Sequence, residues 1–227
     1  GFVMTRIAGT AIARKLLRDE AYAGAREAIP AQIGAILARL HAIDVDRLPP
    51  LHRFTVAGLI EQQQTLLDAF GEPHPVFELA LSWLRRNRPA SAPRSALVHG
   101  DFRTGNFLAD ETGVSAILDW ELAHVGDPQE DLGWFCIKAW RFGNVDRPAG
   151  GFGPREALYD AYEAAGGAPD RSAARFWEIY GTLRWGIICL AQAQTHLSGA
   201  QRSVELATIG RRAAETEHDL LQLLEEA

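Results

Sequence analysis

The 227-residue sequence contains few lysines and cysteines and no long apolar segment. Lys15 and Lys138 are its two lysines and no basic run occurs, which argues against a nucleic-acid partner. Cys136 and Cys189 lie far apart in apolar surroundings, so we expect reduced thiols in a core and a cytoplasmic location. We find no signal peptide and no apolar run of 18 residues, so no membrane contact is expected. The oligomeric state stays open.

Glycine-rich phosphate-binding loops are also missing. Neither G-x-G-x-x-G nor G-K-[S/T] occurs, and neither lysine lies in a strand-like run near the start of the chain. The composition, 47% hydrophobic and 23% charged with a net charge of −6, is that of a folded globular protein. At this length the chain can bury a sizeable core in one or two domains.

Helical periodicity dominates the chain outside its centre. Predicted helices cover residues 30–41, 55–70, 76–88, 131–142, 155–165, 172–196 and 201–225. Pro30 is expected in the first turn of the first of these helices, and Thr55 at the N-cap of the second. Together with a few short strands, these helices predict an α+β fold that is mainly α.

The centre of the chain, residues 96–131, predicts a β-hairpin with carboxylates at its ends. Strands are expected at 106–109 and 114–118, joined by a turn of Asp, Glu, Thr and Gly. If Ala109 pairs with Val114, Asn106 falls opposite Ile117. Asn106 and Asp119 would then point to the same face, two positions apart along the ladder, or roughly 7 Å. One ion and its ligands could span that distance.

The charges of the same segment support an ion site. Between His99 and Asp131 there are eight acids and one firm base, Arg103. Converging carboxylates repel one another by about 4 kcal/mol per pair at 4 Å unless a cation or a proton intervenes. Asp and Asn oxygens suit Mg2+, which takes one or two carboxylates and completes its shell with water and phosphate oxygens.

Three linked motifs in this segment resemble a known family. H-G-D-F-R-T-G-N, residues 99–106, has the H-x-D-x-x-x-x-N spacing of the kinase catalytic loop. L-D-W-E, residues 118–121, lies where kinase-like enzymes carry their second metal-binding Asp, and V-G-D-P-Q-E-D-L, residues 125–132, is similar to a further signature. In this order they resemble the aminoglycoside phosphotransferase and choline kinase group of small-molecule kinases.

The resemblance implies the chemistry and the roles of individual residues. It implies transfer of the γ-phosphoryl group of ATP to the hydroxyl of a small molecule with Mg2+ as cofactor. Asp101 would be the catalytic base, and Asn106 and Asp119 would be the Mg2+ ligands, with Glu121 as a possible assistant. His99 is expected to have a structural role.

Asp127, Asp131 and His41 are also expected to have structural roles. The two carboxylates should brace the catalytic loop and begin the following helix, because Asp127-Pro128 is a good helix start. His41 ends a predicted helix, where a structural histidine is more common than a ligand.

The resemblance also implies the domain organisation. Residues 1–8 would be the hinge strand left from a missing N-terminal nucleotide-binding lobe, with Met4, Thr5 and Arg6 as nucleotide contacts. Residues 9–227 would form the protein-kinase-like C-terminal lobe, which carries the catalytic hairpin and the acceptor site. On this interpretation the chain alone shows little ATP turnover.

Several alternatives stay open. The acceptor could be an amino sugar, a choline-like alcohol, another sugar or a hydroxyacyl thioester, since the motifs look most like those of aminoglycoside phosphotransferase-like proteins, some of which accompany acyl-CoA dehydrogenases. The sequence does not indicate whether ATP or GTP is the preferred nucleotide. The chain could also be a non-catalytic kinase-like binding module, although the intact Asp101, Asn106 and Asp119 argue against a degenerate site. A metal-dependent phosphoesterase gains no support from the motif spacing.

Overall fold

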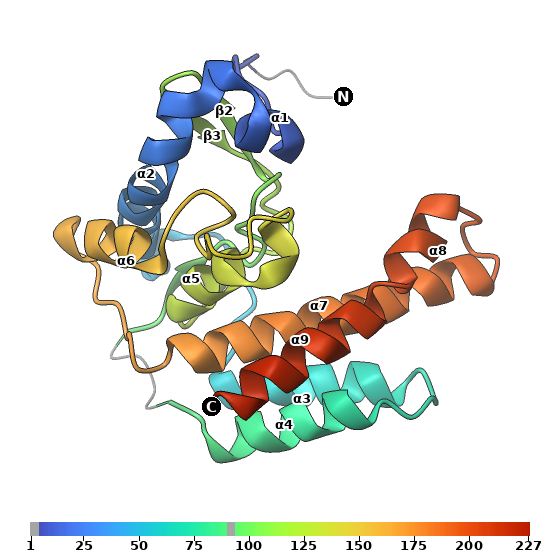
Figure 1. Ribbon diagram of the computed structural model, residues 1–227. Helices are drawn as coiled ribbons and strands as arrows, with labels where there is room; N and C mark the ends of the chain where they lie inside the picture. The colour runs from blue at the N-terminus through green and yellow to red at the C-terminus, as the bar shows by residue number, and fades with distance from the viewer. Residues whose placement is uncertain (1–4, 90–93) are drawn as a thin grey trace.

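A computed structural model describes residues 5–89 and 94–227 as two helical layers joined through a small β region (Figure 1). The helices and strands are α1 (Ala13–Arg18), α2 (Ala23–His41), α3 (Val56–Asp68), α4 (Pro75–Arg86), β1 (Ala96–Val98), β2 (Phe107–Asp110), β3 (Gly113–Ile117), β4 (His124–Gly126), α5 (Gln129–Cys136), α6 (Arg155–Ala164), α7 (Ala174–Leu197), α8 (Val204–Gly210) and α9 (Ala213–Glu225). Short 3-10 turns are η1 (Glu20–Tyr22), η2 (Val45–Arg47) and η3 (Lys138–Trp140). The mainly helical α+β fold is as predicted.

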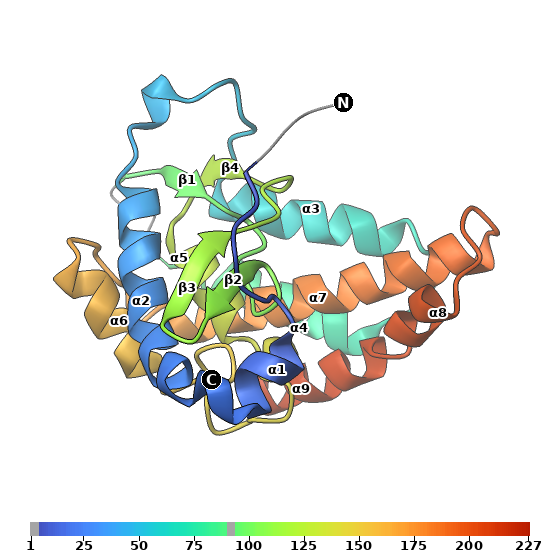
Figure 2. The ribbon, with the colours of Figure 1, turned by 90° about the horizontal axis from the view of Figure 1, so that it is seen from above.

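Two antiparallel strand pairs form the β region, and Figure 2 shows both beside α2. The β2–β3 hairpin has the predicted pairing of Ala109 with Val114. A bulge then shifts the register, so Phe107 pairs with Ile117, and the backbone N–H of Leu118 donates to the carbonyl of Asn106. The prediction that Asn106 lies opposite Ile117 is therefore wrong by one residue, because β3 carries an extra residue at the bulge. The β1–β4 pair was not predicted, since a three-residue strand leaves no periodic signal.

The upper layer in Figure 1 is built around α2, which packs most extensively on α6. This helix begins at Ala23, so Pro30 lies in its interior and not in its first turn, contrary to the prediction. Burial explains the longer helix: Ala25, Ile29 and Ile33 recur every four residues and are fully buried, as the apolar face of a helix requires. Their burial stabilises a helix that carries an internal proline.

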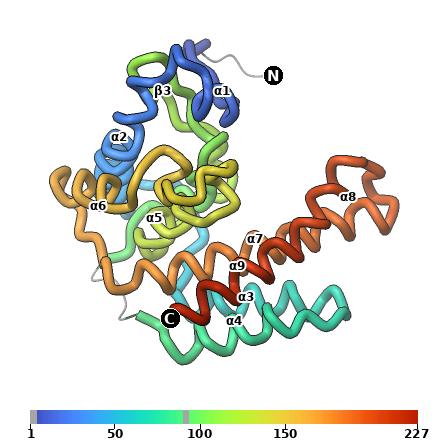
Figure 3. Tube along the Cα trace, in the orientation of Figure 1, coloured from blue at the N-terminus to red at the C-terminus, as the bar shows by residue number. Residues whose placement is uncertain are grey.

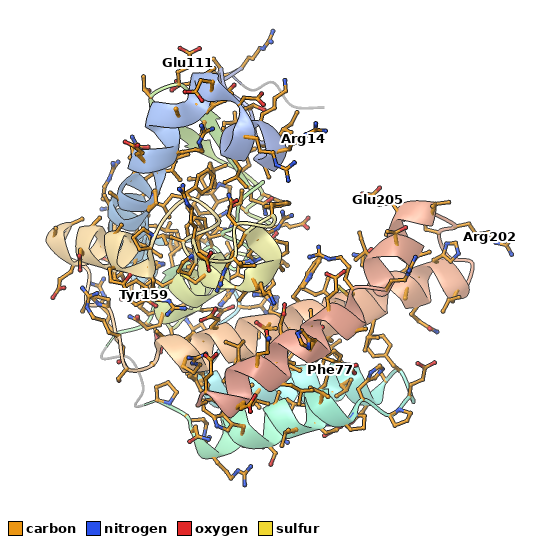
Figure 4. The ribbon with its side chains drawn as sticks, viewed as in Figure 1. Arg14, Phe77, Glu111, Tyr159, Arg202 and Glu205 are labelled. Carbon is orange, nitrogen blue, oxygen red and sulfur yellow. The ribbon has the colours of Figure 1, made fainter. Side chains whose placement is uncertain are left out.

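The lower layer consists of α3, α4, α7 and α9, with α8 at its far end (Figure 3). Thr55 caps α3 as predicted, its hydroxyl accepting from the N–H of Gly58 at 3.0 Å. Phe77 of α4 is fully buried, and Figure 4 shows it within this layer. The prediction of a single helix over 201–225 is wrong, because the segment divides into α8 and α9 at Arg211. Gly210, just before this break, packs closely on α7: a Cβ atom on it would meet Ala193 at 2.5 Å.

The helix α5 joins the two layers. Its residues Leu132, Phe135 and Cys136 belong to the upper core, while Trp134 belongs to a separate cluster that faces α7. Every residue of α5 is buried, so its position is fixed from both sides. Cys136 and Cys189 are buried free thiols, as predicted.

The first described residues run along the hairpin without forming a strand of their own. Thr10 makes an isolated antiparallel bridge to Ala109, and the hydroxyl of Ser115 donates to the carbonyl of Ala8. Residues 5–8 of the predicted hinge strand form no strand, the bridge at Thr10 follows them, and residues 1–4 lie outside the described residues. Within residues 5–89 and 94–227, every helix is too short or too polar to cross a lipid bilayer.

The packing of α2 on α6 makes a prediction about two glycines of one helix. A Cβ atom on Gly34 would meet the carbonyl oxygen of Leu158 at 2.3 Å, whereas one on Gly24 would meet nothing within 4 Å. We expect Gly34→Ala to lower the free energy of unfolding by about 1–3 kcal/mol through overpacking. Gly24→Ala should raise it only slightly, by at most about 0.5 kcal/mol, because Gly24 lies in the first turn of α2. Urea denaturation measures both, and equal effects would contradict this packing.

Candidate active site

The catalytic-loop motif begins where β1 ends, and a buried carboxylate holds it there. Asp131 of α5 is fully buried, and its two oxygens accept from the backbone N–H groups of His99 at 2.8 Å and Gly100 at 3.0 Å. The ring of His41, at the end of α2, adds a third bond to the same carboxylate at 3.1 Å. Burial opposes ionisation, but the hydrogen bond from His41 and those from the loop N–H groups lower the pKa of Asp131 below its usual value. The predicted bracing role of Asp131 and the structural role of His41 are confirmed.

Gly100 is required by the turn that follows. Its φ is +81°, and a Cβ atom there would lie 2.5 Å from the carbonyl oxygen of Leu122. A larger residue would therefore push the loop away from the segment that follows Asp119. This close approach brings the catalytic-loop motif, residues 99–106, next to the segment that follows the L-D-W-E motif, residues 118–121.

The carboxylate of Asp101 emerges from this turn and is held by three donors. Its Oδ1 accepts from the indole Nε1 of Trp134 at 2.8 Å. Its Oδ2 accepts from the Nδ2 of Asn106 at 2.6 Å and from the Nε of Arg103 at 3.2 Å. A carboxylate has about four acceptor positions, so three donors leave one position, on Oδ1, without a partner among the described residues. The side chain as a whole is 15% exposed.

His99 supports the loop from beneath and has no free nitrogen. Its Nε2 lies 2.9 Å from the carbonyl oxygen of Leu118, and its Nδ1 accepts from the backbone N–H of Asp101 at 3.2 Å. Because a carbonyl can only accept, the proton of the neutral ring is on Nε2. The ring is fully buried and ties the loop to the end of β3, so its predicted structural role is confirmed.

Asn106 faces Asp101 at the start of β2. Its amide nitrogen donates to both the carbonyl and the Oδ2 of Asp101, at 3.0 and 2.6 Å. With the nitrogen so used, the amide oxygen is the atom that can bind a cation. The residue is 6% exposed, so its orientation is fixed by the loop.

Asp119 lies one residue beyond Leu118, whose backbone N–H bonds to the carbonyl of Asn106. Its φ of +66° is unusual for a residue with a side chain and costs about 1–3 kcal/mol. The residue is exposed, and no side chain within the described residues bonds to its carboxylate. Asn106 and Asp119 lie at the same end of the hairpin. Because Asn106 is opposite Leu118, the ladder does not put the two side chains on one face two positions apart, as predicted. Their donor set fits Mg2+, which needs one or two protein carboxylates.

The structure says less about the predicted nucleotide contacts and about Glu121, the possible assistant at the metal. Thr5 and Arg6 are exposed and in no helix or strand, and Met4 lies outside the described residues. Glu121 is exposed in the loop after Asp119. Within residues 5–89 and 94–227, no group of three or more His, Cys, Asp or Glu side chains is arranged to hold a metal ion, so a metal here would rely on the amide of Asn106.

The contact of Trp134 with Asp101 was not predicted from the sequence, because a tryptophan in an apolar helix usually belongs to the core. A signal was available. Trp134 follows Asp131 by three residues, so both lie on the same face of α5 and both reach the catalytic loop.

A second buried ion pair supports the loop that follows Asp119. The Nδ1 of His124 lies 2.9 Å from the carbonyl of Leu122, and its Nε2 lies 3.1 Å from the carboxylate of Glu130. Both partners accept hydrogen bonds, so this geometry favours the ring with a proton on each nitrogen. Burial opposes this charge, but the hydrogen bond and the charge of Glu130 raise the pKa of His124. Arg184 of α7 also donates to Glu130, at 3.1 Å.

The kinase-type loop, the hairpin after it and the helical lobe around them have the fold of kinase-like phosphotransferases. The chain belongs to the phosphotransferase enzyme family, whose model matches residues 1–177. The resemblance and the fold class expected from the sequence are thereby confirmed.

The chain is also similar to individual proteins. A candidate aminoglycoside phosphotransferase from Ralstonia eutropha JMP134 shares the fold with a TM-score of 0.77 and 24% identity, over 98% of this chain and 72% of that one. An aminoglycoside phosphotransferase, APH(3'')-Id from Streptomyces rimosus in complex with ADP and streptomycin, gives a TM-score of 0.56 and 20% identity, over 74% and 67%. Mouse acyl-CoA dehydrogenase family member 10 is 34% identical over 120 residues, 49% of this chain and 11% of that protein. The chain therefore spans a small part of the length of this curated relative.

The raised pKa of His124 makes a prediction about pH. A histidine whose pKa is raised in the folded state stabilises the fold fully at pH values below its unfolded-state pKa. This stabilisation is lost as the pH rises through the raised, folded-state pKa. Wild type should therefore be more stable than His124→Gln at about pH 6, and the difference should shrink towards about pH 9. Urea denaturation at both pH values measures this difference.

His52→Gln is the matched control, because His52 is exposed and stacks on Phe54 without an ion pair among the described residues. This variant measures the effect of replacing an exposed histidine that has no such ion pair. A wild-type advantage over His124→Gln that stays constant with pH would show that the ring is not charged in the folded protein.

Proposed function

We propose that this chain is the catalytic lobe of an ATP-dependent small-molecule kinase that transfers the γ-phosphoryl group to a hydroxyl. The observation that carries the proposal is the carboxylate of Asp101, held by three donors with one acceptor position open. The ADP complex of the Streptomyces rimosus relative supports a nucleotide as the second substrate.

Asp101 acts as the base in this proposal. The acceptor hydroxyl donates to the open position on Oδ1, its oxygen forms a bond to the γ-phosphorus, and the bond from that phosphorus to the β–γ bridging oxygen breaks. The proton passes to Asp101 and then to solvent, and ADP leaves. The donors on the other acceptor positions fix the direction of this carboxylate, so its contribution is mainly one of position.

Asn106 and Asp119 are the proposed metal-binding residues. When bound, Mg2+ neutralises the charge of the triphosphate and orients its terminal group. Asn106 contributes its amide oxygen, because its nitrogen is bonded to Asp101. Asp119 contributes a carboxylate that bonds to no described side chain. Thr5 and Arg6, with Met4 before them, stay proposed nucleotide contacts.

Replacing Asp101 tests the proposal. In the complete gene product that carries this chain, Asp101→Ala should lower the rate of phosphoryl transfer by on the order of 10^3-fold, within the range for loss of a general base. ATP binding, measured by calorimetry, should survive, because Asp101 is not a proposed nucleotide contact. ADP release in the presence of hydroxyl acceptors measures the transfer.

Asp110→Ala is the matched control in the same hairpin. Asp110 lies at the turn, where its carboxylate accepts from the N–H and hydroxyl of Thr112. Its loss should leave the transfer rate close to wild type. Turnover in Asp101→Ala that equals the turnover of Asp110→Ala would remove Asp101 from its role.

A further inference from the structure

We propose that Glu130 of α5 is a positioning residue for the reaction, because its buried carboxylate controls the direction of the Asp101 carboxylate. This inference rests on the proposed function, in which Asp101 is the base. Glu130 acts through other residues. One set of contacts runs through His124 and the other through Arg184, and both sets end at the catalytic loop.

The carboxylate of Glu130 binds two basic side chains from different elements. The residue is 2% exposed. Its Oε2 accepts from the Nε2 of His124, in β4, at 3.1 Å, and its Oε1 accepts from the Nη1 of Arg184, in α7, at 3.1 Å. Figure 1 shows α5 beside α7, and these two helices pack on each other. A buried carboxylate with a partner on each oxygen keeps one orientation, so Glu130 links α5, β4 and α7.

His124 extends the first set of contacts to the residue before Asp101. Its Nδ1 lies 2.9 Å from the carbonyl oxygen of Leu122. A Cβ atom on Gly100 would lie 2.5 Å from that oxygen and 3.2 Å from the Nδ1 of His124. The catalytic loop at Gly100 therefore packs on a carbonyl group that His124 holds in place.

Arg184 extends the second set of contacts to Asp101 itself. Its guanidinium carbon lies 4.6 Å from the centroid of the Trp134 ring, and a cation is attracted to an indole face. The Nε1 of the same ring donates to the Oδ1 of Asp101 at 2.8 Å. Oδ1 also carries the open acceptor position, so the direction of the indole N–H determines where on this oxygen an alcohol can bind.

The two sets of contacts meet at adjacent residues of the catalytic loop, Gly100 and Asp101. One carboxylate therefore constrains both the backbone of the loop and the side chain of the base. Loss of Glu130 releases both constraints, whereas loss of Arg184 releases one. A small displacement of a catalytic group can lower the rate by about 100-fold, so the expected effect is on kcat and not on nucleotide binding.

Glu130→Ala and Glu178→Ala form a matched pair of variants in the complete gene product. Glu178 of α7 is also a buried carboxylate with two basic partners, Arg141 and Arg155. Within the described residues, neither of these arginines bonds to the catalytic loop. Both variants remove a buried charge and should lower stability, but only Glu130→Ala should disturb Asp101.

Hydrogen exchange of the Trp134 indole N–H, followed by NMR, reports the position of Asp101 without turnover. Trp134→Phe assigns the signal by its loss. In wild type this N–H should exchange slowly, because it donates to Asp101. We expect exchange about tenfold faster in Glu130→Ala than in Glu178→Ala, and urea denaturation of both separates local from global opening. Equal rates would show that Glu130 only stabilises the fold, which would overturn the inference.

Arg184→Ala decides the question if Glu130→Ala does not fold. In this variant Glu130 keeps its other partner, while the group over the Trp134 ring is removed, so exchange of that indole N–H should again be about tenfold faster. Arg171→Ala is its control, because Arg171 also pairs with carboxylates and lies 5.6 Å from an aromatic ring, that of Tyr159. The same exchange rate in both arginine variants would contradict the role of Glu130.

Turnover is measured separately as ADP release with glucosamine, choline, glucose and 3-hydroxybutyryl-CoA as acceptors. In Glu130→Ala, kcat should fall by about 10- to 100-fold while the KM for ATP stays near wild type. Glu178→Ala should keep the wild-type kcat, and equal kcat values in the two variants would overturn the inference. Turnover in Asp101→Ala equal to wild type would instead contradict the proposed function, and the exchange rates would still decide whether Glu130 positions that carboxylate.

Discussion

The carboxylate of Asp131 lies beneath the catalytic loop and accepts from two successive backbone N–H groups and from His41. A buried charge of this kind is stable only when its hydrogen bonds are complete, so the loop is held in one conformation. That conformation turns Asp101 outward and requires glycine at position 100, where the chain passes close to Leu122. The position of the proposed base therefore depends on a residue that never contacts a substrate.

The helix α5 extends this constraint to the whole molecule. Asp131 and Trp134 on one of its faces reach the catalytic loop, and its other residues complete the upper core. Through Trp134 and the tryptophans behind it, the carboxylate of Asp101 is connected to α7 of the lower layer. The proposed base thus lies at the junction of the two layers.

Much of this arrangement could be predicted from the sequence. The cap at Thr55 and the pairing of Ala109 with Val114 follow from local signals, and both are confirmed. The bulge in β3 could not be predicted, because it accompanies contacts with the distant segment at Ala8 and Thr10. The contact of Trp134 with Asp101 and the break after Gly210 likewise depend on tertiary packing, which a local pattern does not contain. The grouping of Asp101, Asn106 and Asp119 at one site of metal and nucleotide binding stays a prediction.

The most direct test of that grouping uses a paramagnetic ion. The complete gene product is loaded with ATP and Mn2+, and the side-chain amide signals of Asn106 and Asn87 are followed by NMR. Asn87 donates to the carbonyl of Trp83 at the far end of α4, so it reports on a remote surface. The account predicts that the Asn106 signal broadens beyond detection while the Asn87 signal stays sharp. A sharp Asn106 signal with bound Mn2+ and ATP would contradict it.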